Sequence, residues 1–320
     1  APGESGSGAQ ATEQKNVETK TFRIVSFLPT NHLFTRDVIP MWMEKVEQET
    51  GGEIKLEWAG GPESIPSPDQ FDAVRNGVID INFNTSSYYG HLMPEMLALH
   101  LSPYSPAEER ENGYFDYLSE RFAEQGLVYL GRWLSPANPF HFWSNKEVST
   151  IEDFKGMTIR SNPTYHDILQ ALGANPVDIP PSDVYTALER GMVEGFGFPL
   201  LGPHEDGWTE VTKYFIDEPF LNQNATILMN AKAFASISPE NQQKLRELTA
   251  EFEAEMMAHF EKMNEQERKA ITDAGVQIIK LNPEESQQFQ ELVTRVKWES
   301  MAKSAPDQVE ELKRLLLKEQ

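Results

Sequence analysis

Cysteine is absent from this chain of 320 residues, and so are long apolar runs. Without cysteine the protein has no disulfide bond, no thiolate metal ligand and no cysteine nucleophile. No stretch approaches the roughly 18–20 consecutive apolar residues that a membrane-spanning helix needs. The sequence therefore predicts a soluble chain, and its length is enough for two domains with ample apolar core.

Basic residues are scarce, because 28 Lys and Arg stand against 50 Asp and Glu, which gives a formal net charge of −22. A nucleic-acid backbone would be repelled by this charge, and no basic stripe interrupts it. Nucleic acid is therefore excluded as a partner. The acidity itself is typical of a solvated surface that keeps a protein soluble.

Motifs for catalysis and metal binding are also missing. There is no GxSxG elbow and no pair of catalytic carboxylates on a known motif. Gly195 and Gly197 have the spacing of a dinucleotide loop but fall within an expected strand. Among the seven histidines the nearest metal candidate is His204-Glu205-Asp206, which is more typical of a surface loop. We therefore expect no enzyme activity, no cofactor and no metal.

The first 20 residues are small, polar and glycine-rich, which is typical of a disordered leader or tether. The chain also begins without Met, as a mature product does after its signal peptide is removed, and as an expression product can. A lipid-anchored cysteine just before Ala1 is one further interpretation of such a tether. The expected location is extracytoplasmic.

Two parts of the chain follow one plan. Residues 67–84 match 181–198, and upstream of each lies a second matching pair at 24–32 and 158–166. Internal similarity on this scale predicts one supersecondary unit used twice, hence two lobes that enclose a cleft. The aligned pairs are Phe71 with Tyr185, Gly77 with Gly191, Asp80 with Glu194, Pro29 with Pro163, Thr30 with Thr164, and His32 with His166.

Each unit has the order strand, helix, strand, helix, strand, which predicts a mainly parallel sheet flanked by helices. The expected strands are 21–29, 53–60, 78–84, 127–134, 157–161, 175–179 and 192–198. The expected helices are 39–50, 67–76, 106–125, 165–172, 182–190 with Ser182 as its cap, 239–274, 284–303 and 306–318.

The helix expected after Ser238 is unusually long, with Pro239 at its first position and Gly275 as its stop. Its apolar residues do not sustain a heptad repeat, so a packed amphipathic helix is favoured over a coiled-coil dimer. A helix of about 40–50 Å is long enough to span both lobes.

Arg160 is the centre of the expected site, and in the sequence alignment it takes the place of Ser26. It ends an apolar strand, so its guanidinium would be partly buried and would need an anionic partner. That partner is either an Asp or Glu side chain or a ligand carboxylate held by two parallel hydrogen bonds. Screening over about 8 Å leaves this local cation dominant despite the net charge.

The other candidates lie where strands of a parallel sheet end, because ligands bind beyond the carboxyl ends of such strands. His32 is either a polar rim residue or a helix-capping group, and the aromatic run 140–143 is either core or an apolar wall of the cleft. The candidate ligand-binding residues beside Arg160 are Asn31, His32, Glu63, Ser64, Asn84, Tyr88, Tyr89, Phe140, Phe142, Asn162, Pro181 and Phe198.

The segments KGMTIRSNP (155–163) and LGANPVDIPPSDVYTALERGMVEGFGFP (172–199) resemble the signature of the periplasmic solute-binding subunits of TRAP transporters, the DctP-type family. The resemblance runs in order over nearly all of residues 21–305. It implies a two-lobed, periplasmic-binding-protein-like α/β fold with a long helix spanning the lobes, no catalysis, and closure around an organic acid anion. In that family the arginine at the position of Arg160 grips the ligand carboxylate.

The resemblance also implies partners and domain limits. The captured anion would pass to a membrane permease driven by a sodium gradient, and the binding subunit would be a monomer. A sensor subunit that presents its closed form to a receptor would share the fold and the site. We expect lobe I at 21–137 plus about 226–265, and lobe II at 138–225 plus about 266–320.

Two departures from the family pattern bear on the ligand. Phe140 stands where many relatives carry a second arginine, and Gly197-Phe198 stand where relatives often have Glu-Asn or Glu-Trp. A Glu-Trp pair helps to hold a metal in some relatives that bind 2-oxo acids. Fewer polar groups and more aromatic ones favour a monocarboxylate, aromatic or a hydroxy or oxo acid, over sialic acid or a C4-dicarboxylate.

Overall fold

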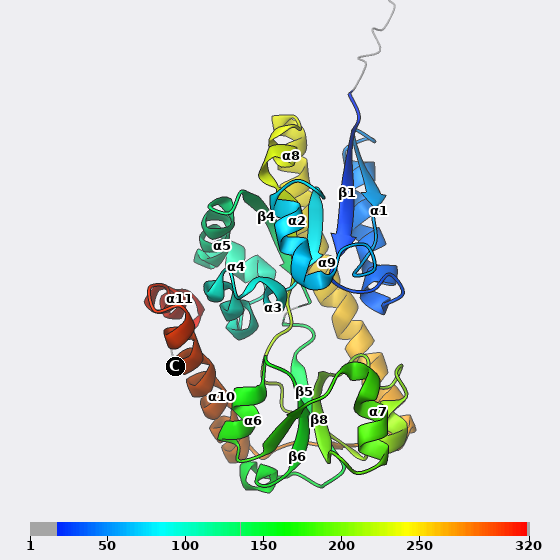
Figure 1. Ribbon diagram of the computed structural model, residues 1–320, viewed down its shortest axis with the longest axis vertical. Coiled ribbons are helices and arrows are strands. Elements are labelled where there is room, and N and C mark those ends of the chain that lie inside the picture. Colours follow the sequence, from blue (N-terminus) through cyan, green and yellow to red (C-terminus); the bar gives the residue numbers. More distant parts are fainter. Residues whose placement is uncertain (1–17, 135, 319–320) are drawn as a thin grey trace, which may run out of the picture.

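The computed structural model describes residues 18–134 and 136–318, which form two α/β lobes stacked along the long axis of the molecule (Figure 1). Each lobe contains one β-sheet with helices on its faces. The expected two-lobed fold is therefore confirmed. Residues 1–17 of the expected leader lie outside the described residues.

The first lobe is built on a five-stranded sheet with the order β2-β1-β3-β10-β4. β1 runs parallel to β2 and β3, and β10 runs antiparallel to β3 and β4. The strands are β1 (Lys20–Ser26), β2 (Ile54–Trp58), β3 (Ile81–Asn84), β4 (Leu127–Trp133) and β10 (Ala225–Asn230). The connecting helices are α1 (Ile39–Glu49) and α2 (Gln70–Arg75).

The second lobe is built on a six-stranded sheet with the order β11-β9-β5-β8-β6-β7. Its strands are β5 (Phe140–Ser144), β6 (Thr158–Ser161), β7 (Asn175–Asp178), β8 (Gly195–Pro199), β9 (Tyr214–Ile216) and β11 (Gln277–Ile279). Helices α6 (His166–Ala171) and α7 (Pro181–Glu189) connect the parallel strands. The expected cap at Ser182 is wrong, because α7 already begins at Pro181, whose fixed φ and missing N–H suit a first helical position.

The repeated unit is confirmed in three dimensions, since β2-β1-β3 and β7-β6-β8 have the same order and are both parallel. The aligned acidic residues Asp80 and Glu194 also make the same kind of contact in the two copies. The Asp80 carboxylate accepts from the Arg23 N–H at 2.9 Å, and the Glu194 carboxylate accepts from the Thr158 N–H at 3.3 Å.

The strand register corrects the alignment of Arg160. Val25 pairs with Asn82 in the first lobe, and Arg160 pairs with Phe196 in the second, so Arg160 takes the place of Val25 rather than Ser26. The loop after β6 is one residue shorter than the loop after β1, which shifted an alignment anchored on the loop prolines. Neighbouring residues of a strand point to opposite faces of the sheet. A shift of one residue therefore changes the face from which the Arg160 side chain extends.

The helix expected at 106–125 is wrong as a single element. The structure has α4 (Pro106–Asn112) and α5 (Tyr114–Ala123), separated by Gly113 at a φ of 96°, a left-handed conformation that ends a helix. Before them, the short helix α3 (Ser86–Tyr89) follows β3 directly.

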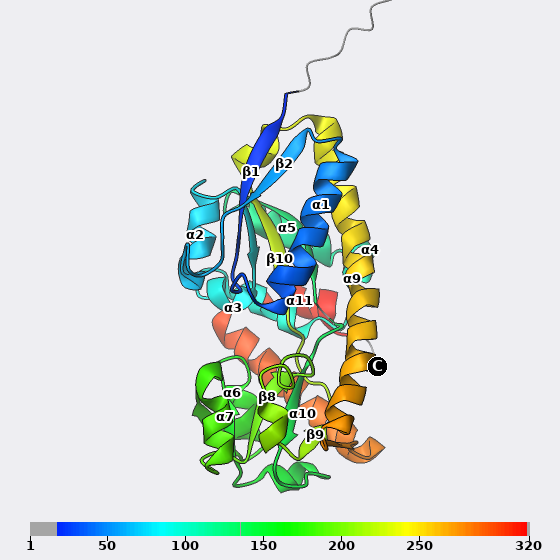
Figure 2. The ribbon, with the colours of Figure 1, turned by 90° about the vertical axis from the view of Figure 1, so that its right-hand side faces the viewer.

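The long helix is confirmed as α9 (Pro239–Asp273), and it follows the short helix α8 (Ala231–Ala235). Ser238 caps α9 by accepting from the Asn241 N–H at 3.1 Å, and Gly275 lies just past its end at a φ of 94°. Figure 2 shows α9 running beside both lobes. Its residues up to Phe260 pack in a first-lobe core, and Ile271 packs in a second-lobe core.

The C-terminal helices are α10 (Pro283–Ser304) and α11 (Val309–Leu316). α10 begins against the second lobe, where Phe289 and Val293 join its core, and ends against the first. Trp298 and Leu312 lie in the same apolar cluster as Tyr114 of α5. We therefore place the end of α10 and all of α11 in the first lobe, where the sequence predicted the second, because their apolar faces are buried there.

Two chain segments cross between the sheets side by side. The first joins β4 to β5 and the second joins β9 to β10, and they meet at a β-bridge between Pro139 and Asn222. Leu134, at the start of the first crossing, has a φ of 80°, which is a strained conformation for a residue with a side chain. We call this pair of crossings the waist between the lobes.

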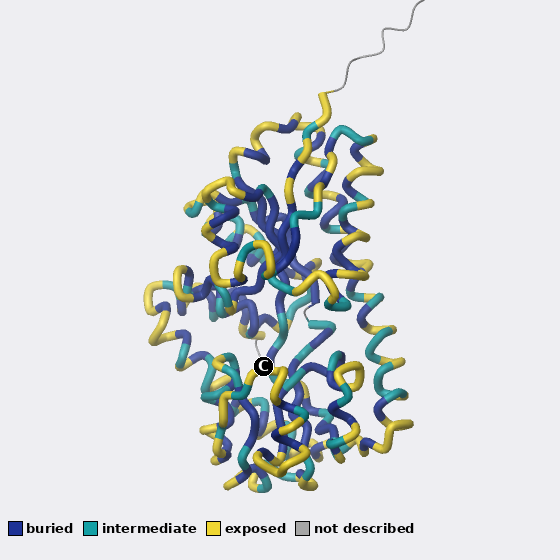
Figure 3. Tube along the Cα trace, turned by 45° about the vertical axis from the view of Figure 1, so that its right-hand side comes forward, coloured by how far each residue is buried: buried dark blue, intermediate teal, exposed yellow. Residues whose placement is uncertain are grey.

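Burial is greatest in the central strands, since β3, β5 and β10 are buried at every residue, whereas the edge strands β7 and β11 are mostly exposed (Figure 3). Apolar clusters cover both faces of each sheet. No helix within residues 18–134 or 136–318 combines the length and apolarity needed to cross a bilayer.

Candidate functional site

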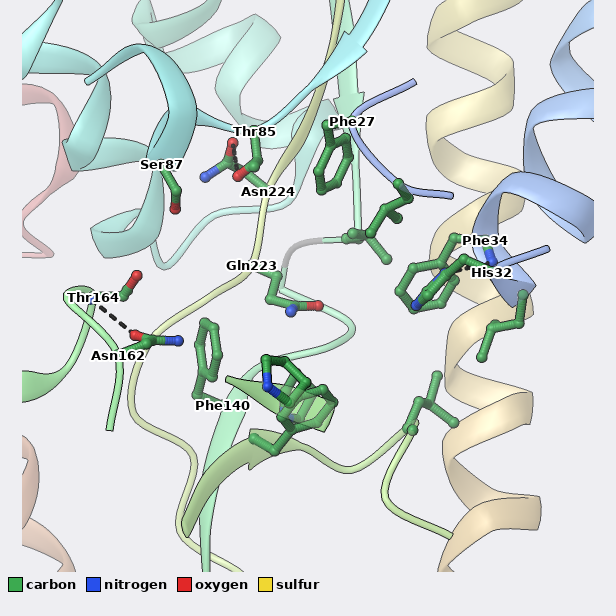
Figure 4. A pocket seen from close by; sticks show the side chains of 18 of the residues that line it. Phe27, His32, Phe34, Thr85, Ser87, Phe140, Asn162, Thr164, Gln223 and Asn224 are labelled. Atoms are coloured by element: carbon green, nitrogen blue, oxygen red, sulfur yellow. Dashed lines mark hydrogen bonds between the residues drawn. The ribbon is translucent and has the colours of Figure 1, made fainter. Parts of the chain in front are cut away.

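A cavity of about 700 Å³ lies between the lobes at the waist. This volume is in the usual range for sites that hold a small molecule. Figure 4 shows its lining, with Phe27, Thr85 and Asn224 from the first lobe facing Phe140, Asn162 and Thr164 from the second. The two crossing segments contribute Leu134 and Gln223.

Arg160 lines this cavity from β6 and is 4% exposed. Its Nε donates to the Ile179 carbonyl at 2.8 Å, and its Nη1 donates to the Tyr165 hydroxyl at 3.2 Å and to the Gly197 carbonyl at 3.4 Å. All three partners are uncharged. Within the described residues no carboxylate lies in ion-pair distance of this guanidinium, so the salt-bridge alternative is not found there.

Tyr165 and Gly197 hold the guanidinium in place. The Tyr165 hydroxyl donates to the Gly197 carbonyl at 2.6 Å, and burial raises the pKa of Tyr165 to about 12, so the group stays neutral. A Cβ at position 197 would lie 2.6 Å from the Tyr165 ring. The Tyr165 ring therefore leaves no room for a side chain at position 197.

The first lobe contributes a polar wall. The Asn224 Oδ1 accepts from the Ser86 N–H at 3.0 Å, and its Nδ2 donates to the Ser86 Oγ at 2.8 Å. The Ser86 and Ser87 hydroxyls lie 3.3 and 3.4 Å from the His100 Nε2. These residues come from α3, from the segment before α4 and from the crossing before β10, so three elements meet at this wall.

The protonation of His100 follows from its contacts. Its Nδ1 lies 2.7 Å from the Asn222 carbonyl oxygen, and a carbonyl only accepts, so Nδ1 carries the proton and Nε2 accepts from the serines. Burial lowers the pKa of His100 to about 4, which keeps the ring neutral at neutral pH. A second buried histidine, His141, has its pKa lowered to about 4 for the same reason.

This buried neutral histidine makes stability depend on pH. The folded pKa lies below the unfolded value near 6.5, so the contribution is present above 6.5 and is lost as the pH falls towards 4. When the pH falls from 7 to 5, we expect the protonation of His100 on unfolding to lower the free energy of unfolding of the wild type by about 2 kcal/mol. Urea unfolding of wild type and His100→Gln at both values checks this: the variant should lose less, and equal losses would contradict the assignment.

An apolar wall faces the polar one. Phe140 and Phe198, on the paired strands β5 and β8, line the cavity from the second lobe, and Phe27, Phe34 and Leu201 add to it. Aromatic and aliphatic surface of this kind suits the body of a ligand rather than its charge.

The mouth of the cavity is acidic. Glu205 and Asp206 lie on an exposed loop after β8 and line the cavity edge. Partial burial, together with the neighbouring Glu205, raises the pKa of the Asp206 carboxyl above its ordinary value. Residues 18–134 and 136–318 contain no group of three or more His, Cys, Asp or Glu side chains placed to hold a metal ion.

The cavity collects part of the predicted set. Beside Arg160, the predicted residues that line it are Asn31, His32, Tyr88, Phe140, Asn162, Pro181 and Phe198. His32 also accepts from the Phe34 N–H at 3.1 Å through Nδ1, so this lining side chain also bonds to the backbone at the start of the next helical turn. The predicted residues outside the cavity lining are Glu63, Ser64, Asn84, Tyr89 and Phe142.

Those five residues have other partners. Glu63 accepts from Thr30 and from the Gly61 N–H, and Ser64 donates to the Ala59 carbonyl, so both stabilise their own loop. The other three are buried in or beside the cores: Asn84 accepts from the Thr85 N–H, the Tyr89 hydroxyl lies 2.9 Å from Thr226 Oγ1, and Phe142 packs on Phe220. Sequence alternation alone did not separate the two faces of these segments.

Several lining residues were not predicted: Phe27, Thr85, Ser87, His100, Gln223 and Asn224. Gln223 and Asn224 could have been found from their place on the crossing before β10, had that strand been recognised. Thr85 and Ser87 lie in the rim segment 84–89 that follows a predicted strand, but only Asn84, Tyr88 and Tyr89 of that segment were chosen as candidates. His100 carries no local signal, because its role depends on contacts far along the chain.

Comparisons with known proteins agree with this geometry. The model of the DctP family, bacterial extracellular solute-binding proteins of family 7, matches residues 24–304. A monocarboxylate 2-oxoacid-binding periplasmic protein of Nostoc sp. is 20% identical over 278 residues, which are 82% of this chain and 74% of that protein.

Two solved structures have the same fold. A TRAP periplasmic solute-binding protein from Ochrobactrum anthropi has a TM-score of 0.82 at 21% identity and covers 94% of this chain and 95% of its own. A TRAP periplasmic solute-binding protein from Desulfovibrio salexigens with bound orotic acid has a TM-score of 0.77 at 23% identity. It covers 92% of this chain and 97% of its own. The chain belongs to the bacterial extracellular solute-binding proteins of family 7, the periplasmic solute-binding proteins of TRAP transporters.

Proposed function

We propose that this protein captures an organic acid anion outside the cytoplasm, without catalysis, and delivers it to a TRAP-type membrane permease. The observation that carries the proposal is Arg160, a buried guanidinium that lines the cavity and has uncharged partners among the described residues. A buried charge without a counter-ion is costly, so a site that keeps one is suited to an anionic ligand.

The ligand is a monocarboxylate with an apolar body, in the class of aromatic, hydroxy or oxo acids. Phe140 and Phe198 supply the apolar surface beside Arg160. The names of relatives support this class, because they include a protein that binds monocarboxylate 2-oxoacids, one that binds 2,3-diketo-L-gulonate and one with bound orotic acid.

Binding is a closure of the lobes. Arg160 and Asn162 come from the second lobe, whereas Thr85, Ser87 and Asn224 come from the first. A ligand that contacts both walls stabilises the closed form over the open one, and the segments that join the lobes, namely the two crossings, α9 and α10, take up the bend. The permease then receives the closed, loaded form.

A thermal-shift panel tests this function. Monocarboxylates with aromatic, hydroxy and oxo substituents should raise the melting temperature, and a ligand at about 100 times its Kd adds about 2.7 kcal/mol. Choline and glucose, which lack a carboxylate, serve as controls and should give no shift. The proposal fails if no carboxylate in the panel stabilises the protein.

A further inference from the structure

Residues 163 and 164 separate two cavities. One is the cavity that Arg160 lines, and the other is a second cavity of about 310 Å³, which Pro163 and Thr164 also line. The lining of the second cavity includes Leu97 from the first lobe and residues from the last turns of α10. Atoms that face a cavity lack van der Waals partners on that side, so hydrogen bonds contribute more to holding this segment in place.

Two side chains hold the segment through its backbone. The Asn162 Oδ1 accepts from the Thr164 N–H at 2.9 Å, a hydrogen bond that Figure 4 marks. The Lys297 Nζ, on α10, donates to the Thr164 carbonyl at 2.9 Å. Both backbone polar groups of Thr164 are therefore paired, one with a side chain that lines the Arg160 cavity and the other with a side chain of α10.

Lys297 is itself held in place. Its Nζ lies 3.3 Å from both carboxylate oxygens of Asp167, in the first turn of α6, and the same carboxylate accepts from the Ser300 hydroxyl at 2.9 Å. The Lys297 side chain is 16% exposed and that of Asp167 is 33% exposed. A partly buried ion pair is screened less by salt than an exposed one, so this contact ties α10 to the second lobe.

The same turn of α10 also contacts the first lobe. Trp298 and Met301 are buried in the apolar cluster that contains Tyr114. Residues three apart lie on one side of a helix, so this pair and the pair of Lys297 and Ser300 leave α10 in different directions. One turn of α10 therefore packs on the first lobe and holds the segment of the second lobe that carries Asn162.

We propose that Lys297 is a positioning residue for the ligand, because it fixes the backbone of Thr164 and, through it, the amide of Asn162 at the cavity wall. Lys297 lines only the second cavity, so it acts without touching a ligand beside Arg160. This inference rests on the proposed function and adds a residue on a helix that packs on both lobes. Without Lys297 the segment leaves its place, and the apparent Kd rises as the fraction of molecules with the segment in place falls.

Lys297→Met tests the positioning by isothermal titration calorimetry with the best carboxylate of the thermal-shift panel. The variant removes the ammonium and keeps an unbranched side chain. We expect the Kd to rise about tenfold, as when the segment is in place in about one molecule in ten. Lys303→Met makes the same change at an exposed position of α10 and should bind as wild type does. Lys297→Arg should recover most of the affinity, because the second cavity leaves room for a guanidinium that reaches both acceptors.

Asp167→Asn separates positioning from a direct attraction between Lys297 and an anionic ligand. If the two residues acted on the ligand only through their charges, the loss of a negative charge would strengthen the binding of an anion. We expect weaker binding instead, by about threefold, because Lys297 loses the carboxylate that holds it. A Kd at or below the wild-type value in Asp167→Asn would overturn the proposal.

Hydrogen exchange of the unliganded protein tests the same claim without a ligand. The N–H groups of Thr164, Tyr165 and His166 all donate to Asn162, so their exchange reports whether the segment is in place. Lys297→Met should raise their exchange rates at least about tenfold, and Lys303→Met should leave them unchanged.

The outcomes separate the two proposals. A Kd of Lys297→Met within about twofold of wild type, or unchanged exchange at residues 164–166, would overturn the positioning role and leave the proposed function intact. If no carboxylate binds to wild type, the proposed function fails and the exchange result decides whether Lys297 holds the segment. The melting temperature of each variant is recorded, and Asp167→Asn supplies both measurements if Lys297→Met does not fold.

Discussion

Arg160→Ala should abolish most of the affinity for the carboxylate ligand, by a loss of about 2–5 kcal/mol, or roughly 30-fold to several thousandfold in Kd. The guanidinium lies at the cavity wall, 4% exposed, and its described partners are two carbonyls and a hydroxyl. A carboxylate that binds there supplies its counter-charge in a desolvated place, where charge-assisted hydrogen bonds are strongest. Calorimetry with the best ligand of the panel measures the loss.

The controls for this prediction separate geometry from charge. Arg160→Lys keeps the charge but not the planar pair of donors, so it should fall between wild type and Arg160→Ala. Arg190→Ala removes an exposed arginine from the same lobe and should bind as wild type does. If Arg160→Ala binds the ligand within about threefold of wild type, another group holds the carboxylate.

Glu109→Gln should lower the free energy of unfolding by about 3–5 kcal/mol, because it leaves the charge of Arg132 buried without its counter-ion. Arg132 on β4 is 0% exposed, and its Nε and Nη2 donate to the two Glu109 carboxylate oxygens at 2.6 and 2.7 Å. The Arg132 Nη1 is buried and has no partner among the described residues, so the arginine depends heavily on this carboxylate. Urea unfolding followed by circular dichroism measures the change.

A matched surface variant and a double variant complete this test. Glu111→Gln makes the same change at an exposed site on the same helix, and we expect a difference within about 0.5 kcal/mol. Replacing both partners, as Glu109→Leu with Arg132→Met, should cost less than Glu109→Gln alone, since no buried charge is left. A Glu109→Gln loss as small as that of Glu111→Gln would show that the pair contributes little.

The two buried arginines show why Arg160, and not Arg132, belongs to the site. Both end or nearly end a strand next to the waist, and both are almost fully buried. Arg132 is neutralised by Glu109 inside the first lobe, whereas the neighbours of Arg160 carry no charge. The sequence identified Arg160 from its strand and from the family resemblance, but it could not show which arginine would find an internal partner.

Much of the fold was predictable because its signals are local. The end of α9 at Gly275, its cap at Ser238 and the strand–helix order of both lobes follow from capping chemistry and apolar periodicity. The break at Gly113 was missed because the helical pattern continues on both sides of it. The placement of α11 was missed because the sequence of an amphipathic helix shows that it has an apolar face but does not indicate which lobe buries that face.

A residue of the site could be predicted from the sequence only where a charged, polar or aromatic side chain stands at the end of an expected strand. Arg160, Asn162 and Phe198 follow that rule and line the cavity. Tyr89, on α3 after β3, and Phe142, in the middle of β5, face the cores instead, because neighbouring residues leave an element on different sides. Asn224 and His100 lie far along the chain from the residues they contact, and only the paired crossings bring them to the cavity.

A crystal structure of the protein with its best carboxylate ligand tests whether Arg160 binds the carboxylate. We expect closed lobes with the ligand carboxylate about 2.7–2.9 Å from the Arg160 guanidinium, at the distance of a charge-assisted hydrogen bond. A ligand that turns its carboxylate to another residue, with Arg160 still held only by Ile179, Tyr165 and Gly197, would contradict it.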